Sequence, residues 1–90
     1  AVANSVPVIV ANRAGFEASP VKGDPGIKFW GQSFIAGPQG ELLAQAGVDE
    51  ETTLLVDLDM SRTEQVKRIW PYFRDRRIDA YEDLTKRWRD

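Results

Sequence analysis

The side chains that could carry chemistry in this chain are carboxylates, lysines, tyrosines and hydroxyls, because its 90 residues include neither histidine nor cysteine. A thiol nucleophile, a histidine acid–base pair, a zinc site of His and Cys and a disulfide framework are therefore excluded within it. Asp57 and Asp59 stand two apart, so on a strand they share a face, a spacing that paired carboxylates can use. Exposed strand faces carry such pairs routinely, which favours a surface position over catalysis.

Three arginines form a second cluster that could bind a carboxylate in the bidentate manner of a guanidinium. Arg74, Arg76 and Arg77 stand close together, but Asp75 and Asp79 are interleaved with them. Pairing with these two carboxylates, or with a neighbouring subunit, is the interpretation that the spacing favours.

Charge is divided unevenly along the chain. Residues 1–60 hold 3 basic and 8 acidic side chains, a net charge of −5, whereas residues 61–90 hold 9 basic and 6 acidic ones, a net charge of +3, which together give −2. The six interspersed carboxylates weaken any attraction to phosphate, so we expect no nucleic-acid partner. The longest apolar run, 6–11, is far shorter than the roughly 20 residues of a membrane span, so we expect no membrane partner either.

The elements that must position these groups begin with an apolar run at 6–11. Both of its faces are apolar and β-branched, which predicts a strand covered on two sides. Pro7 cannot donate a ladder hydrogen bond and is placed at the strand's beginning or at a sheet edge. Residues 14–28 have no period and carry several glycines and prolines, which predicts a long loop with a type II turn at Asp24, Pro25 and Gly26.

The central part of the chain predicts a hairpin followed by a further strand. Residues 32–37 and 42–46 are its two strands, joined by a turn at 38–40. Residues 53–60 alternate, with Leu54, Val56, Leu58 and Met60 on one face, which predicts a strand with one buried face.

A helix is expected from Ser61, where Ser61 and Glu64 form a capping box. Pro71 should bend or restart it near Trp70. The tail, 71–90, is highly charged but still carries apolar bulk, for which a small chain offers little room. An intersubunit contact is therefore the natural use of this segment. Its apolar positions are Ile78, Tyr81, Leu84 and Trp88.

The order strand, loop, hairpin, strand, helix and tail predicts an α+β or layered α/β piece. We expect strands and hairpin over about 6–60, a helix over about 61–70 and a tail over 71–90, all within one domain. A single helix leaves the sheet covered on one face only, although the first strand calls for cover on both. The chain also begins at Ala1 rather than methionine. These features predict a piece of a longer polypeptide.

Three runs resemble a known family. They are VPVIVANRAGFE at 6–17, IKFWGQSFIAGPQGELLAQA at 27–46 and VDLDMSRTEQVKRIWPYFRDRRIDAY at 56–81. Together they are similar to the C-terminal third of amidases in the carbon–nitrogen hydrolase (nitrilase) superfamily, and within it to the branch that hydrolyses N-carbamoylputrescine. The resemblance covers nearly the whole chain. A β-ureidopropionase-like branch shares the stretch at 11–17, so another substrate within the superfamily stays open.

The resemblance implies a fold, an activity and a location. The fold is part of a four-layer αββα sandwich, incomplete in this chain and paired across a homo-oligomer. The activity is hydrolysis of N-carbamoylputrescine to putrescine, ammonia and carbon dioxide in the cytoplasm, with no metal or organic cofactor. A cysteine nucleophile, a glutamate base and a lysine that stabilises the oxyanion are implied in the N-terminal part of the same subunit. No catalytic residue is expected within this chain, which should be inactive alone.

The resemblance also implies which residues here line the substrate site. Asn12, Arg13 and Glu17 follow a strand that ends at the mouth of the active site, and Glu17 could attract the cationic end of the substrate. Glu17 could equally pair with Arg13. Trp30 could shape the pocket or pack in the core, and Ser33 could line the pocket or bind backbone.

The aromatic and basic residues of the helix end and tail are the expected interface. They are Trp70, Phe73, Arg74, Arg76, Arg77, Tyr81 and Trp88. The expected partners are the remaining N-terminal part of the subunit, a second copy of the subunit and a small carbamoylated amine. A different class of function, a free-standing interaction domain that docks partners through the same aromatic residues, also stays open.

Overall fold

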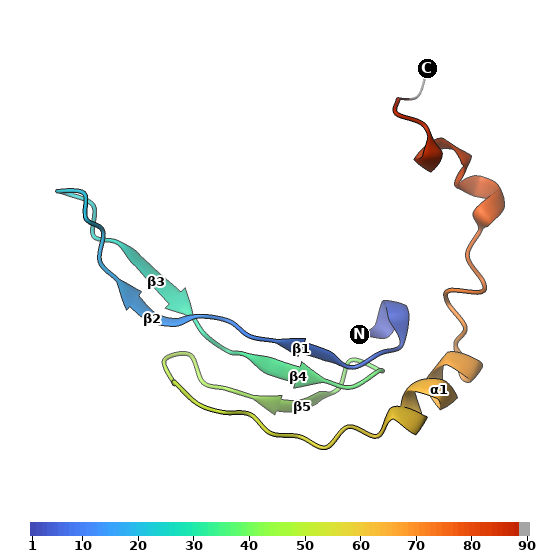
Figure 1. Cartoon of the computed structure of the whole chain (residues 1–90), viewed down its shortest axis with the longest axis horizontal. Coiled ribbons are helices and arrows are strands. Elements are labelled where there is room, and N and C mark those ends of the chain that lie inside the picture. Colours follow the sequence, from blue (N-terminus) through green and yellow to red (C-terminus); the bar gives the residue numbers. More distant parts are fainter. Residues whose placement is uncertain (89–90) are drawn as a thin grey trace.

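The computed structural model describes residues 1–88, which form a thin, curved layer with a long arm at its end (Figure 1). Its extents are 55 × 46 × 12 Å and its radius of gyration is 19.6 Å. A compact domain of this length would have a radius of about 12 Å. The chain is therefore extended over a wide surface and encloses little core of its own.

A three-stranded antiparallel sheet forms the centre of the layer. It consists of β1 (Val8–Val10), β4 (Phe34–Ala36) and β5 (Leu42–Gln45) in the order β1-β4-β5. The strand predicted at 6–11 and the hairpin of 32–37 with 42–46 are therefore confirmed, with shorter strands. The central strand is the buried one, since Ile35 is 7% exposed. Its partner Ile9, on the edge strand β1, is 68% exposed, so the cover that this strand calls for is not supplied within the described residues.

A two-stranded antiparallel ribbon extends the sheet and corrects the expectation of a loop at 14–28. It pairs β2 (Ala14–Glu17) with β3 (Ile27–Trp30). The strands are short, and β2 contains Gly15 with a positive φ of 93°, so neither shows a clear period in sequence. The ribbon tip turns at 21–24, where the Asp24 amide donates to the Val21 carbonyl at 3.2 Å, and not at Asp24, Pro25 and Gly26 as expected. At the expected position the Asp24 carboxylate accepts a hydrogen bond from the Gly26 amide at 3.0 Å.

The strand predicted at 53–60 was wrong, although its alternation is correct. Leu54, Val56 and Leu58 are half-buried while the residues between them are exposed, Leu55 by 93%. The segment pairs with no strand in the described part of the chain, and a strand is defined by that pairing. Alternating hydrophobic residues indicate an extended chain with one half-buried face, but they do not indicate whether a neighbouring strand is present.

Helix α1 (Met60–Ile69) starts one residue earlier than expected, and its cap corrects the predicted capping box. Asp59 is the N-cap, and its Oδ1 accepts hydrogen bonds from the Ser61 backbone N–H at 3.0 Å and the Ser61 hydroxyl at 2.6 Å. The helix ends at Ile69, close to the end expected at about residue 70, because proline disfavours helical backbone at the residue before it, and it does not restart after Pro71. Only part of its apolar stripe is covered, since Val66 is 6% and Ile69 67% exposed.

A polar contact ties α1 to the β4–β5 turn. Arg62 forms an ion pair with Glu41 and donates from Nη2 to Gln39 Oε1 at 2.8 Å. Glu41 in turn accepts a hydrogen bond from the Gln39 backbone N–H at 3.0 Å, so one arginine closes the turn and holds the helix against the sheet end. The predicted turn is confirmed by a hydrogen bond from the Gly40 amide to the Gly37 carbonyl at 2.9 Å.

The arm after α1 leads away from the layer (Figure 1). It contains two 3₁₀ turns, η2 (Ile78–Ala80) and η3 (Glu82–Thr85), which contact each other but no other element of the described part of the chain. Its large apolar side chains are exposed, among them Ile78 by 72%, Leu84 by 80% and Trp88 by 69%. Within residues 1–88 no helix is long and apolar enough to cross a membrane.

The cap of α1 predicts a pH dependence. Hydrogen bonds from the Ser61 hydroxyl and backbone N–H lower the pKa of Asp59 below its usual value. A carboxyl with a lowered folded pKa stabilises the fold above its unfolded pKa and loses that contribution as the pH falls through the folded value. We therefore expect amide exchange at 61–63 to accelerate as the pH falls below about 4, beyond the intrinsic trend. Asp59→Asn keeps an oxygen acceptor and should show no such acceleration; an equal acceleration in both proteins would contradict the assignment.

Candidate functional site

The seam where the sheet passes into the ribbon is held together by several hydrogen bonds outside the regular elements. The chain runs from β1 through Asn12 into β2, and from β3 through Gly31 and Ser33 into β4. The Asn12 backbone N–H donates to Ser33 Oγ at 2.8 Å, and the Ser33 hydroxyl donates to the Asn12 carbonyl at 3.2 Å. Asn12 Nδ2 also donates to the Gly31 carbonyl at 2.7 Å. Asn12 and Ser33 thus join the two crossing chains.

The backbone conformation at the seam requires a glycine. Gly31 has a φ of 59°, and a Cβ at this position would lie 2.3 Å from the Val48 carbonyl oxygen. The chain after β5 therefore passes directly over the seam. It is held there by hydrogen bonds from the Gln32 amide to the Gly47 carbonyl at 3.1 Å and from the Ala46 amide to the Ser33 carbonyl at 2.8 Å.

A hollow of about 240 Å³ opens beside this seam. Its wall includes Asn12, Ser33 and two carboxylates, Glu50 and Glu51, which form no ion pair within residues 1–88. The sequence did not predict a role for these glutamates, because nothing local indicates that the segment after β5 returns to the seam. The described residues contain no group of three carboxylate, histidine or cysteine side chains that could hold a metal ion.

Arg13 and Glu17 are adjacent on the ribbon. Arg13 Nη1 lies 2.7 Å from Glu17 Oε2, and the two side chains are 61% and 56% exposed. The Arg13 guanidinium also lies over the Phe29 ring, 4.4 Å from its centroid. The pairing that the sequence offered as one interpretation of Glu17 is therefore present.

The five residues predicted to line the substrate site fall into three places. Asn12 and Ser33 meet at the seam, and Arg13 and Glu17 meet on one ribbon face. Trp30 is paired with Ala14 in the register, which places it on the opposite ribbon face, and it is 77% exposed. No hollow within residues 1–88 gathers all five, and their role in substrate binding stays a prediction.

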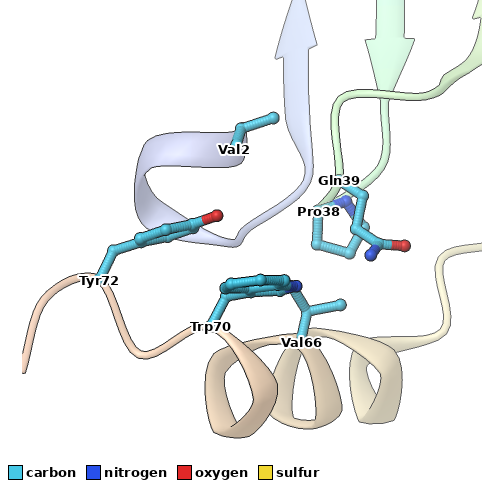
Figure 2. Close-up of a pocket in the computed structure, with 6 residues that line it drawn as sticks. All are labelled: Val2, Pro38, Gln39, Val66, Trp70 and Tyr72. Atoms are coloured by element: carbon cyan, nitrogen blue, oxygen red, sulfur yellow. The ribbon is translucent and has the colours of Figure 1, made fainter.

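A second hollow, of about 300 Å³, lies between α1, the β4–β5 turn and the N-terminal 3₁₀ turn η1 (Val2–Asn4) (Figure 2). Trp70 and Tyr72 are stacked along one side of it, with centroids 6.3 Å apart and planes 10° apart. Val2 and Pro38 face them across the hollow (Figure 2). The wall is mainly aromatic and aliphatic, so this hollow is suited to packing rather than to polar chemistry.

The residues expected to form an interface continue from this hollow into the arm. Phe73 is 72% exposed and carries the Arg76 guanidinium 3.8 Å from its ring centroid. Arg74 pairs with Asp75 at 2.8 Å and Arg77 with Asp79 at 2.5 Å, as the interleaved charges predicted. Tyr81 and Trp88 are exposed by 41% and 69%. Their contact with another subunit stays a prediction.

Comparison with known proteins identifies relatives across almost the whole chain. The profile of the family described as Carbon-nitrogen hydrolase matches residues 1–68. The chain is 44% identical over 83 residues to an N-carbamoylputrescine amidase of Solanum tuberosum, covering 91% of this chain and 28% of that protein. It is 31% identical over 88 residues to a citrullinase of Francisella tularensis, covering 98% of this chain and 30% of that protein.

The solved structures include a close match. A carbon-nitrogen hydrolase from Helicobacter pylori G27 is 48% identical and superimposes with a TM-score of 0.85, over 98% of this chain and 30% of that one. The predicted fold is thereby confirmed at the level of a mixed helix-and-sheet part of such a hydrolase. The chain spans less than a third of the length of each of these relatives.

The seam predicts the effect of removing one hydroxyl. Ser33→Ala removes both hydrogen bonds of the Ser33 hydroxyl and should lower the free energy of unfolding of the complete protein by about 1 kcal/mol. It should also speed proteolytic cleavage at the ribbon tip, because the ribbon is held to the sheet at the seam. Ser19→Ala, at the ribbon tip itself, is the matched control and should change the unfolding free energy less. Equal effects of the two substitutions would show that the seam has no special role.

Proposed function

We propose that this chain, which belongs to the carbon–nitrogen hydrolase family, is part of an enzyme subunit that hydrolyses N-carbamoylputrescine. The observation that carries the proposal is its 44% identity, over 91% of its length, to proteins named N-carbamoylputrescine amidase. Water is added across the carbamoyl group, so that each N-carbamoylputrescine yields one putrescine, one ammonia and one carbon dioxide.

The chemical step requires groups that this chain does not carry. Attack on a carbamoyl carbon by a thiolate needs a cysteine, and the sequence has none. The proposed nucleophile, its glutamate base and the oxyanion-stabilising lysine therefore belong to the rest of the subunit. The contribution proposed for this chain is to bind and orient the substrate and to exclude water.

The hollow beside the seam supports this role. The hydrogen bonds of Asn12 and Ser33 join the two crossing segments. These side chains are therefore proposed to hold the wall in place and not to react with the substrate. Glu50 and Glu51 give the wall a negative charge, which suits a substrate with a cationic amine end. Glu17 is proposed to act on the same amine end, with its charge partly neutralised by Arg13.

The open layer supports a place inside a larger fold. Ile9 in the sheet is 68% exposed and Leu55 in the segment after β5 is 93% exposed. Apolar side chains exposed in this way need further protein to bury them. We propose that the chain is the C-terminal segment of a single hydrolase domain and that its layer lies inside a four-layer αββα sandwich. The rest of the subunit would cover one face and the facing sheet the other. A free-standing interaction domain would need a compact core, which a radius of gyration of 19.6 Å does not fit.

The arm supports an assembly of more than one subunit. Within residues 1–88 its turns η2 and η3 contact each other and no other helix or strand, their large apolar side chains are exposed, and buried aromatic residues dominate binding energy at interfaces. We propose that the arm packs against a second copy of the subunit in a cytoplasmic homo-oligomer.

A direct assay tests the proposed activity. A complete subunit that contains this sequence should release putrescine and ammonia from N-carbamoylputrescine, and the isolated 90-residue chain should release neither. Citrulline and a simple ω-amide, offered at the same concentration, should give a kcat/KM at least tenfold lower. Preference for either of these substrates would assign the subunit to another branch of the family, and turnover by the isolated chain would refute the division of roles.

The proposed assembly predicts the effect of polar substitutions in the arm. Leu84→Ser combined with Trp88→Ser should raise the dissociation constant of the oligomer at least tenfold in sedimentation experiments, because large apolar anchors carry most interface energy. Val21→Ser, a change of similar chemistry at an exposed position of the ribbon tip, is the control and should leave this constant unchanged. An unchanged oligomer in the double variant would exclude the arm from the contact.

A further inference from the structure

We propose that Arg13 and Glu17 act together as a specificity element for the charged end of the substrate. In this element Glu17 binds an ammonium group, and Arg13 binds a carboxylate that lies beside that ammonium. Arg13 would then weaken the binding of a substrate that carries the ammonium alone, N-carbamoylputrescine included, so the preference for that substrate would be set by groups outside this pair. The inference rests on the proposed function and adds to it the class of substrate that each side chain favours.

The Arg13 guanidinium is held in place before any ligand arrives. Its backbone carbonyl accepts a hydrogen bond from the Gly31 amide at 3.0 Å, and its backbone N–H donates to Asn12 Oδ1 at 2.9 Å. Its side chain lies on the half-buried Phe29 ring and on Glu17. A cation placed over an aromatic face and beside a carboxylate loses little further freedom when it binds an anion.

Gly15 stands between Arg13 and Glu17 on the ribbon. Four residues along a strand separate two Cα atoms by about 13 Å, and both side chains point to the same face. A Cβ at Gly15 would meet no atom within 4 Å, so the ion pair does not depend on the missing side chain, and the glycine is required instead by its φ of 93°. The guanidinium and the carboxylate reach each other along this face, and the guanidinium lies over the ring of Phe29, the residue with which Gly15 is paired.

The pair leaves hydrogen-bonding capacity on both partners. Within residues 1–88 it joins Nη1 of Arg13 to Oε2 of Glu17, and both side chains are more than half exposed. Glu17 Oε1 and the remaining guanidinium N–H groups can still bind a ligand. An ammonium with a neighbouring carboxylate would complete an alternating ring of four charges. A lone ammonium would meet a carboxylate whose charge Arg13 already offsets.

This arrangement separates two kinds of ureido substrate. A ureido amine such as N-carbamoylputrescine has an ammonium only, whereas a ureido amino acid such as citrulline has an ammonium and a carboxylate on one carbon. Removing the Arg13 charge should therefore change KM in opposite directions for the two substrates. If the role of Arg13 were purely structural, KM would change in the same direction for both.

Steady-state kinetics of the complete subunit test this expectation. Arg13→Gln should lower KM for N-carbamoylputrescine about threefold and raise KM for citrulline about threefold, a size typical of partly exposed charge pairs, with little change in kcat. Glu17→Gln should raise KM for both. Arg13→Lys, which keeps the charge, should return KM for both substrates to near the wild-type values. Shifts of KM in the same direction for both substrates, or none, would overturn the proposal.

A binding measurement keeps the test independent of turnover. Calorimetry with putrescine and with ornithine, which differ by one carboxylate, should show the same opposite shifts in dissociation constant for Arg13→Gln. Lys28→Gln is the matched control, because Lys28 lies on the opposite ribbon face and pairs with Asp49 at 3.9 Å. If the wild-type subunit hydrolyses neither ureido compound, the proposed function fails, and the two binding shifts still decide whether Arg13 and Glu17 discriminate as proposed.

Discussion

The hydrogen bonds between Asn12 and Ser33 are the constraint on which the rest of this structure depends. The chain continues from β1 of the sheet into β2 of the ribbon and from β3 of the ribbon into β4 of the sheet, so without a fixed crossing the ribbon could turn about the seam. A two-stranded ribbon is only marginally stable in isolation, and the seam gives it the sheet as a base. Arg13 directly follows this crossing, and the hollow with Glu50 and Glu51 borders it.

Sequence reasoning succeeded where the signal is local. The hairpin of β4 and β5, the turn between them and the end of α1 before Pro71 follow from residues adjacent in the chain. It failed where a partner decides the structure. The segment 53–60 alternates as expected but has no neighbouring strand within residues 1–88. The ribbon at 14–30 is held by cross-strand pairing, which cannot be predicted from short strands that contain a glycine.

The candidate site shows the same division. The pairing of Arg13 with Glu17 was predictable from a spacing of four, but the glycine between them and the Phe29 ring beneath them become meaningful only with the register. Glu50 and Glu51 were missed because they reach the seam only after the chain has returned past Gly31. Family resemblance supplied the expected substrate groups, whereas cross-strand geometry separated them into distinct places.

A layer only 12 Å thick has consequences for how its residues tolerate change. Solvent exposure in a single layer does not indicate whether a position tolerates substitution. An exposed apolar side chain such as Ile9 or Leu55 has its packing partners outside the layer. Polar replacements at such places should behave as interior replacements once the surrounding protein is present. A mutational tolerance map of the intact enzyme would then reveal, position by position, which side of this layer faces inward.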